Sequence, residues 1–182
     1  MKQLRITWAL LAALVACSHP ARAQASPEYK LKAAYLFNFA KFVDWPSNTF
    51  AEATTPIVIG VLGEDPFGTV LEEIVQGRTI NGRPLTIQRA RRLEELKTCQ
   101  LLFISRSEQQ RLKNILTQLG ERPVLTVSDA DNFLDGGGTI RLLMEGRSVR
   151  FEISAVASER AGLKIDAQLL NLARAVRPVT PK

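Results

Sequence analysis

The chain has 182 residues, of which 46% are apolar and 23% are charged, and its mean hydropathy is −0.01. These values are ordinary for a globular protein and exclude disorder of the whole chain. The length allows one domain with a substantial core and is short for two. Beyond the N-terminal segment no stretch of about 18 residues is continuously apolar, so we expect no later membrane span.

The N-terminal segment has the three-part pattern of a secretory signal peptide. Lys2 and Arg5 provide a positive start, residues 6–16 are apolar, and Ala21-Arg22-Ala23 places small residues at a cleavage site. We therefore predict that residues 1–23 are removed and that the protein is exported to the periplasm.

A second interpretation of this segment stays open. The run Leu14-Val15-Ala16-Cys17 has the spacing of a bacterial lipoprotein signal. In that case Cys17 is lipidated and holds the protein on a membrane.

Removal of the signal changes the chemistry that remains. The signal holds three of the 24 basic residues and no acidic one, which leaves 21 basic and 18 acidic residues and a net charge of +3. The pI of about 9.7 therefore does not indicate nucleic-acid binding. The only histidine, His19, is also removed, which excludes a Ser-His-Asp triad, a Cys-His pair and a histidine metal site. We predict a protein that is not an enzyme and has no cofactor or metal.

Cys99 is the only cysteine left once Cys17 is cleaved off or lipidated, so no intrachain disulfide is expected. Because it opens the apolar run 101–104, we interpret it as a buried small hydrophobe. A bridge between two chains and a redox-sensitive thiol are the alternatives.

The pattern of apolar residues predicts helices alternating with strands. A helix over 28–43 places Leu31, Tyr35, Phe39 and Phe42 on one face. After it we expect strands over 57–62, 85–88, 101–105 and 124–127, helices over 69–76 and 108–119, and a short helical turn over 93–96.

The last third of the chain changes character. Segments 139–144 and 148–153, joined by Glu145-Gly146-Arg147, predict a β-hairpin, and residues 166–176 predict a last helix. We predict a single α/β domain over 24–182. Its mostly parallel sheet is flanked by helices on both faces in a Rossmann-like three-layer arrangement, with the antiparallel hairpin at one end.

Two glycine motifs have competing interpretations. Gly60-x-x-Gly63 follows a strand but lacks the further glycines and the lysine of nucleotide-binding loops, so we interpret it as a strand-end turn. The run 136–138 could form an anion-binding nest of backbone N–H groups, and a flexible turn is favoured.

The charged clusters also favour structural roles. Asp129, Asp131 and Asp135 do not continue into a calcium loop, and turn formation or helix capping explains them better. The basic cluster of Arg89, Arg91 and Arg92 has no interleaved aromatic residue for base stacking, which indicates a solvated loop.

Several blocks, taken in order, resemble a known family. They are Ala33-Ala34-Tyr35-Leu36-Phe37-Asn38-Phe39-Ala40-Lys41-Phe42-Val43-Asp44-Trp45-Pro46, Val61-Leu62-Gly63-Glu64-Asp65-Pro66-Phe67-Gly68, Gly82-Arg83-Pro84, Cys99-Gln100-Leu101-Leu102-Phe103-Ile104-Ser105, Leu125-Thr126-Val127-Ser128-Asp129, Gly137-Gly138, Phe151-Glu152-Ile153 and Gly162-Leu163-Lys164-Ile165. Over roughly residues 28–176 the chain resembles the YfiR family of bacterial periplasmic proteins.

The resemblance implies a regulatory binding protein. The family's namesake inhibits an inner-membrane diguanylate cyclase by binding its periplasmic sensor domain, which lowers cyclic di-GMP and biofilm formation. A similar fold, commonly paired as a homodimer, is implied too. Family members often carry paired cysteines, whereas Cys99 has no partner here. The alternative function is a periplasmic small-ligand sensor that feeds a membrane signalling kinase.

The hairpin and the last helix are our candidates for the partner-binding surface, because they differ from the rest of the sheet and form an edge. The candidate residues are Phe133, Glu145, Phe151 and Gln168. Core packing is the competing interpretation of Phe151. For a dimer contact we expect Tyr35, Phe39 and Phe42 of the first helix, which could equally be ordinary core residues.

Overall fold

The computed structural model describes residues 25–178 of the chain. The predicted signal peptide, including Cys17, lies outside the described residues. In chain order the elements are α2 (Pro27–Lys41), β1 (Val43–Asp44), the 3₁₀ helix η1 (Ser47–Thr49), β2 (Ile57–Leu62), α3 (Val70–Val75), β3 (Thr79–Ile80), β4 (Arg83–Ala90), η2 (Leu93–Leu96), β5 (Leu101–Ile104), η3 (Arg106–Arg111), α4 (Leu112–Leu119), β6 (Leu125–Ser128), β7 (Ile140–Glu145), β8 (Ser148–Ser154), α5 (Ala155–Arg160), β9 (Lys164–Ile165), α6 (Ala167–Leu172) and β10 (Ala175–Arg177).

The main sheet has eight strands in the order β10-β8-β7-β6-β5-β2-β4-β3, and β1 and β9 pair separately. Neighbours from β4 to β7 are parallel, but β7–β8 and β3–β4 are antiparallel. The sheet is therefore mixed, and the prediction of a mostly parallel sheet is wrong. The two antiparallel pairs form because tight turns join β3 to β4 and β7 to β8. A parallel pair would need a long crossover connection instead.

The turn between β3 and β4 reverses the chain with only two residues. Asn81 and Gly82 both have positive φ angles, 51° and 78°, and they form the two-residue connection between paired Ile80 and Arg83. Asparagine and glycine tolerate this conformation best, which is why the pair is typical of hairpins.

The edge of the sheet near the C-terminus is formed by a strand that the sequence pattern does not predict. The predicted last helix ends early, at Leu172, and residues 175–177 form β10, which pairs parallel to β8. The prediction that the hairpin forms the edge of the sheet is therefore wrong. The backbone becomes extended at Ala173, and the N–H of Arg174 donates to the carbonyl of Phe151. The short strand covers backbone groups of β8 that would otherwise be an open edge.

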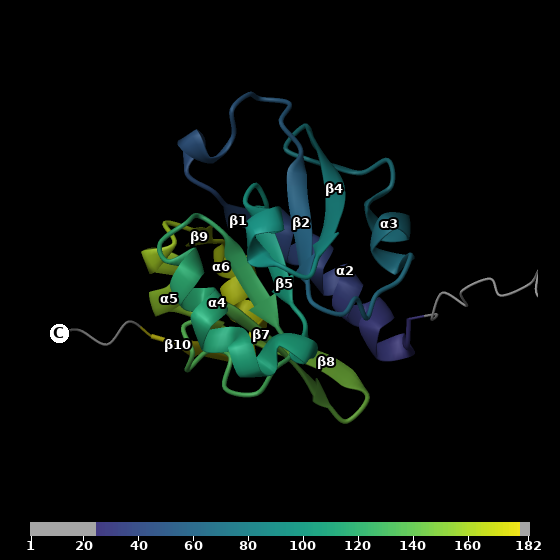
Figure 1. The fold of residues 1–182 in the computed structure, drawn as a ribbon, viewed down its shortest axis with the longest axis vertical. Helices are drawn as coiled ribbons and strands as arrows, with labels where there is room; N and C mark the ends of the chain where they lie inside the picture. The colour runs from purple at the N-terminus through teal and green to yellow at the C-terminus, as the bar shows by residue number, and fades with distance from the viewer. Residues whose placement is uncertain (1–24, 179–182) are drawn as a thin grey trace, which may run out of the picture.

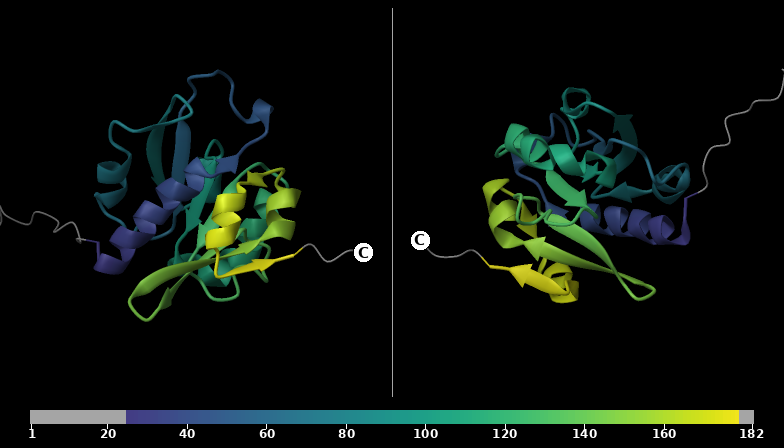
Figure 2. Two further views of the ribbon diagram at one scale, coloured as in Figure 1. Left: turned by 180° about the vertical axis from the view of Figure 1, so that it is seen from behind. Right: turned by 60° about the horizontal axis from the view of Figure 1, so that its bottom comes forward.

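Helices flank the sheet on both faces (Figures 1 and 2). Helices α2, α3 and α6 contribute to one cluster of buried side chains, and η2 and α4 contribute to another. The two clusters are separate because successive strand residues point to opposite faces. Thus Ile59 belongs to the α2 side and Leu62 to the α4 side.

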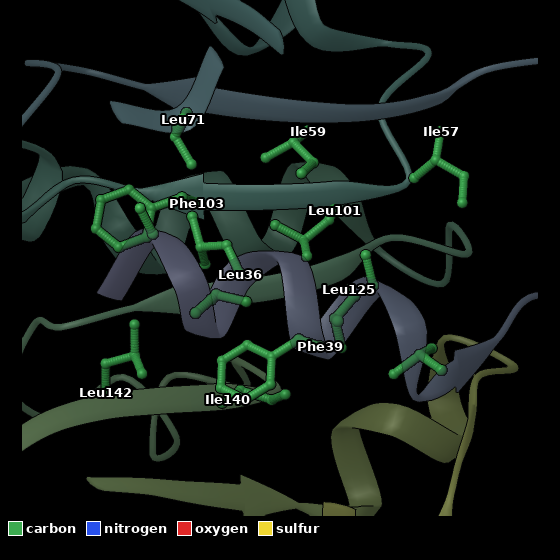
Figure 3. Packing of buried hydrophobic residues seen from close by; sticks show 14 of the residues in the cluster. Leu36, Phe39, Ile57, Ile59, Leu71, Leu101, Phe103, Leu125, Ile140 and Leu142 are labelled. Carbon is green, nitrogen blue, oxygen red and sulfur yellow. The ribbon is translucent and has the colours of Figure 1, made fainter. Parts of the chain in front are cut away.

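Helix α2 has 15 residues, and one of its faces is buried against the sheet. The side chain of Ser26 accepts a hydrogen bond from the N–H of Tyr29, so the helix begins with an N-cap. One face then buries Leu36 and Phe39, which point towards Leu101, Leu125 and Ile140 of the sheet (Figure 3). The Phe39 ring lies 5.1 Å from that of Phe151, in an edge-on arrangement typical of aromatic pairs.

Replacement of Phe39 by alanine should lower the free energy of unfolding by about 3–5 kcal/mol, because the cavity lies in a fully enclosed site. Urea unfolding followed by circular dichroism would measure it. Leu31→Ala on the exposed side of the same helix is the control and should change stability by less than about 0.5 kcal/mol. Equal losses for the two variants would contradict the packing described.

Candidate functional site

The hairpin β7–β8 has one buried and one charged face. Leu142 pairs with Phe151 in register, and both side chains point into the core beneath α2. The next pair, Arg141 and Glu152, points to the opposite face. The hairpin projects beyond the carboxyl end of β6, because only its first residues pair with that strand (Figures 1 and 2).

A continuous chain of ion pairs covers the outer face of the hairpin. Arg141 contacts Asp131 at 3.0 Å and Glu152 at 3.4 Å. Arg174 then bridges Glu152 at 3.1 Å and Glu145 at 3.0 Å. Glu145 finally lies 3.6 Å from Arg150. We call these six residues, Asp131, Arg141, Glu145, Arg150, Glu152 and Arg174, the charged hairpin surface.

This arrangement is better suited to recognition than to stability. The side chains of Glu145, Arg150 and Arg174 are each about half exposed. Exposed ion pairs contribute only about 0–1 kcal/mol. A fixed alternation of charges, however, sets the register of a partner and disfavours wrong partners.

Exposed apolar side chains lie on the opposite face of this edge of the sheet. Met144 shares its face of β7 with Leu142, and Val176 pairs with the core residue Ile153, so both point to the side that α2 covers. Leu172 ends α6, which packs on that same side, and 68% of its surface is exposed. This edge of the sheet therefore presents charges on one face and exposed apolar groups on the other.

The predicted partner-binding residues fall into two groups. Glu145 and Gln168 are exposed, as a contact residue must be. Phe133 and Phe151 are buried core residues, so neither is placed where it could contact a partner, and core packing is the role of Phe151. The Phe133 ring fills the space beside Gly138, where an added Cβ would lie only 2.3 Å away.

The predicted dimer contact requires a similar correction. Phe39 is fully buried within its own chain, so it cannot contact a second copy. The Tyr35 hydroxyl donates to the carbonyl of Val149, and Phe42 packs partly against the same core. This face of α2 packs on the sheet, and a homodimer stays a prediction without an assigned surface.

Cys99 has the environment of a structural residue. It is 3% exposed, and its Sγ lies 3.1 Å from the carbonyl oxygen of Leu96. Burial raises the pKa of the Cys99 thiol to about 11, so the thiol is protonated near neutral pH and is a poor nucleophile. The structure therefore agrees with the interpretation of Cys99 as a buried small hydrophobe and does not favour a readily oxidised thiol.

The glycine run 136–138 is not an anion nest. The three backbone N–H groups donate to the carbonyls of Asn132, Leu134 and Phe133, respectively. No N–H group of the run is thus left to bind an anion.

The other charged motifs have structural partners. The carboxylates of Asp129, Asp131 and Asp135 pair with Lys32, Arg141 and Arg177, respectively. Within residues 25–178 no group of three or more His, Cys, Asp or Glu side chains is arranged to hold a metal ion. In the basic cluster, Arg89 lies on β4 rather than in a loop, and it contacts Asp65 and Glu72.

Sequence reasoning missed a buried polar network that holds the start of α2. Lys32 is 2% exposed, and its Nζ lies 2.5 Å from carboxylate oxygens of both Asp129 and Glu28. The Tyr29 hydroxyl donates to the same Asp129 oxygen at 2.8 Å. Burial and the neighbouring carboxylate raise the pKa of Tyr29, which keeps the phenol protonated as a donor. The spacing of Glu28 and Lys32, one helical turn apart, is the only local signal for this network.

The charged hairpin surface is only partly predictable from the sequence. The position of Glu145 in the turn marks it as a candidate, but Arg141, Glu152 and Arg174 are not among the predicted residues. The alternation of apolar and charged residues in both hairpin strands marks Arg141 and Glu152 as outward-facing. Arg174 has no such signal, because the sequence pattern of its segment predicts helix.

The sequence matches the YfiR/HmsC-like family over residues 29–174, and the chain belongs to this family. The family is regulatory, is generally periplasmic, and is associated with the control of diguanylate cyclase signalling through a membrane protein. No curated protein is similar enough to the chain to count as a match.

A solved structure, a conserved domain protein from Vibrio cholerae O1 biovar El Tor, resembles this one with a TM-score of 0.54 at 10% sequence identity. The alignment covers 85% of this chain and 62% of that protein, so the chain spans less than two thirds of its length. At this identity the likeness concerns the fold alone. Over residues 25–178 no helix is both long and apolar enough to cross a membrane.

Lys32→Met should lower the free energy of unfolding by about 3–5 kcal/mol, because it leaves the buried carboxylate of Asp129 without its cation. The double variant Lys32→Met/Asp129→Leu should regain most of this loss, since no buried charge is left unpaired. Chemical denaturation would measure both. Lys30→Met, at an exposed position of the same helix, should be nearly neutral. A double variant less stable than Lys32→Met would show that the unpaired carboxylate is not the cause of the loss.

Gly60→Cys should form a disulfide with Cys99. A Cβ at position 60 would lie 3.3 Å from the Cys99 Cβ and 3.4 Å from its Sγ, slightly closer than the Cβ–Cβ separation of about 3.5–4.5 Å that is usual in a disulfide. It would also lie 3.1 Å from Leu102 Cδ1, so that side chain must shift a little. The bridge would close a loop of about 40 residues and add about 3–4 kcal/mol in the chain-entropy model, less any strain.

Thiol titration in denaturant, with and without prior reduction, would detect this bridge. Unfolding midpoints under the same two conditions would give its contribution to stability. Gly60→Ala is the control for the added Cβ alone. Because the folded Cys99 thiol is buried and protonated, oxidation is carried out during refolding from denaturant. Two free thiols after this treatment would contradict the described proximity of positions 60 and 99.

Proposed function

We propose that this protein is a periplasmic inhibitor of an inner-membrane diguanylate cyclase. It binds the periplasmic sensor domain of the cyclase through the charged hairpin surface, and so lowers cyclic di-GMP and biofilm formation. Membership of the YfiR/HmsC-like family supports the class of target. The observation that carries the proposed surface is the ion-pair chain on the outer face of the projecting hairpin, whose members Glu145, Arg150 and Arg174 are each about half exposed.

Position also supports this surface. The hairpin extends past the body of the domain, where a partner can reach it without meeting the helices (Figure 2). The buried Phe151 beneath holds the strand rigid, so the charges keep their spacing.

Glu145→Arg should abolish inhibition, because it places a third positive charge beside Arg150 and Arg174. Deletion of the gene should raise cellular cyclic di-GMP, the wild-type gene should restore the low level, and Glu145→Arg should not. The double variant Glu145→Arg/Arg174→Glu restores an internal ion pair in reversed order. Because Arg174→Glu also removes the contact with Glu152, the melting temperature of this double variant is compared with that of Arg174→Glu alone. If it is folded it should still fail to inhibit, since the order of charges that the partner would contact is reversed.

Glu94→Arg, at an exposed position of η2, is the matched control and should inhibit normally. Immunoblots of periplasmic fractions and melting temperatures would show that each variant is present and folded. Capture of membrane proteins on the immobilised chain would measure binding, with a loss of at least about tenfold, or about 1.4 kcal/mol, for Glu145→Arg. Normal inhibition and binding by this variant would rule out the charged hairpin surface.

A further inference from the structure

A groove of about 570 Å³ opens at the amino ends of β2, β5 and β6. It lies between the segment 48–58 and two short segments, 97–100 and 122–124. The charged hairpin surface is at the other end of the sheet, because the hairpin projects past the carboxyl end of β6. The groove is therefore separate from the proposed protein interface. Its volume is within the range of small-molecule sites, roughly 300–1,000 Å³.

The charges of the groove have one sign. Lys97 and Arg122 line it, and no aspartate or glutamate does. The guanidinium of Arg122 donates a hydrogen bond to the backbone carbonyl oxygen of Lys97, which fixes the guanidinium at the wall of the groove. Neither forms an ion pair with an acid in the described part of the chain, residues 25–178. With two basic residues and no acid in its lining, the groove attracts an anion.

The rest of the groove is mainly apolar. Val58, Pro123 and Val124 form walls against which a hydrocarbon body can pack. Asn48, Thr55 and Thr98 add uncharged polar groups to the lining. An apolar wall with a few convergent polar groups is typical of small-molecule sites.

We infer that this groove binds a small organic acid. The carboxylate is held by the cations of Lys97 and Arg122, and the apolar body lies against Val58 and Pro123. Arginine is well suited to this task, since its planar fork matches a carboxylate. The site is independent of the proposed inhibition of a cyclase, because it uses none of the residues of the charged hairpin surface.

The test is an NMR titration of the exported, processed protein with sodium 4-phenylbutyrate, a carboxylate with an apolar body. Saturable shifts of backbone amides are expected in segments 97–100 and 122–124 and not in the hairpin. The uncharged 4-phenylbutanamide should bind at least about tenfold more weakly, which corresponds to about 1.4 kcal/mol. Lys97→Gln should weaken phenylbutyrate binding by a similar factor.

Two control variants test whether binding is specific to the groove. Lys113→Gln removes an exposed lysine of α4 that does not line the groove, and it should leave the affinity unchanged. Glu145→Arg should also leave it unchanged, whatever that variant does to inhibition. The proposal is overturned by the absence of saturable shifts around the groove, by equal affinity for the acid and the amide, or by full affinity of Lys97→Gln.

Discussion

The burial of one face of α2 against the sheet is the interaction on which the rest of the structure depends. Leu36 and Phe39 contact a core to which both the parallel strands and the hairpin contribute (Figure 3). Two adjacent rings, Phe39 and Phe151, join the helix to β8. Without this helix the hairpin would expose its apolar face, and an isolated hairpin is only marginally stable in water.

The same helix carries an electrostatic constraint at its beginning. Lys32 and Asp129 lie far apart in the chain, and their buried ion pair fixes the first turns of α2 next to the end of β6. Such a pair is costly to desolvate, so its main effect is on geometry rather than on net stability. Apolar packing along the length of α2 and the Lys32–Asp129 ion pair near its N-terminus thus fix the position of the helix.

The two proposed binding surfaces, the charged hairpin surface and the groove, lie at opposite ends of the sheet and differ in charge. At the carboxyl end the hairpin leaves the sheet, and acids and bases alternate along its outer face in a balanced chain. At the amino end the lining of the groove is basic and apolar, with no acid to neutralise it. A balanced chain of charges suits a protein partner, whereas a groove with basic residues and no acid suits a small anion.

Local sequence patterns were sufficient to predict the α/β class, most strands, the hairpin, and the family to which the chain belongs. These follow from local periodicity and from turn residues such as Gly146, which act over a few positions. The tertiary structure alone decided which aromatic residues are enclosed, because Phe133 looks like a loop residue until the backbone of Gly138 leaves room for its ring. It also decided that residues 175–177 are a strand, since the free edge of β8 offers them hydrogen bonds that no local pattern records. The charged hairpin surface and the Lys32–Asp129 pair were likewise decided only there, because each joins residues that are distant in the chain and neighbours only in the folded protein.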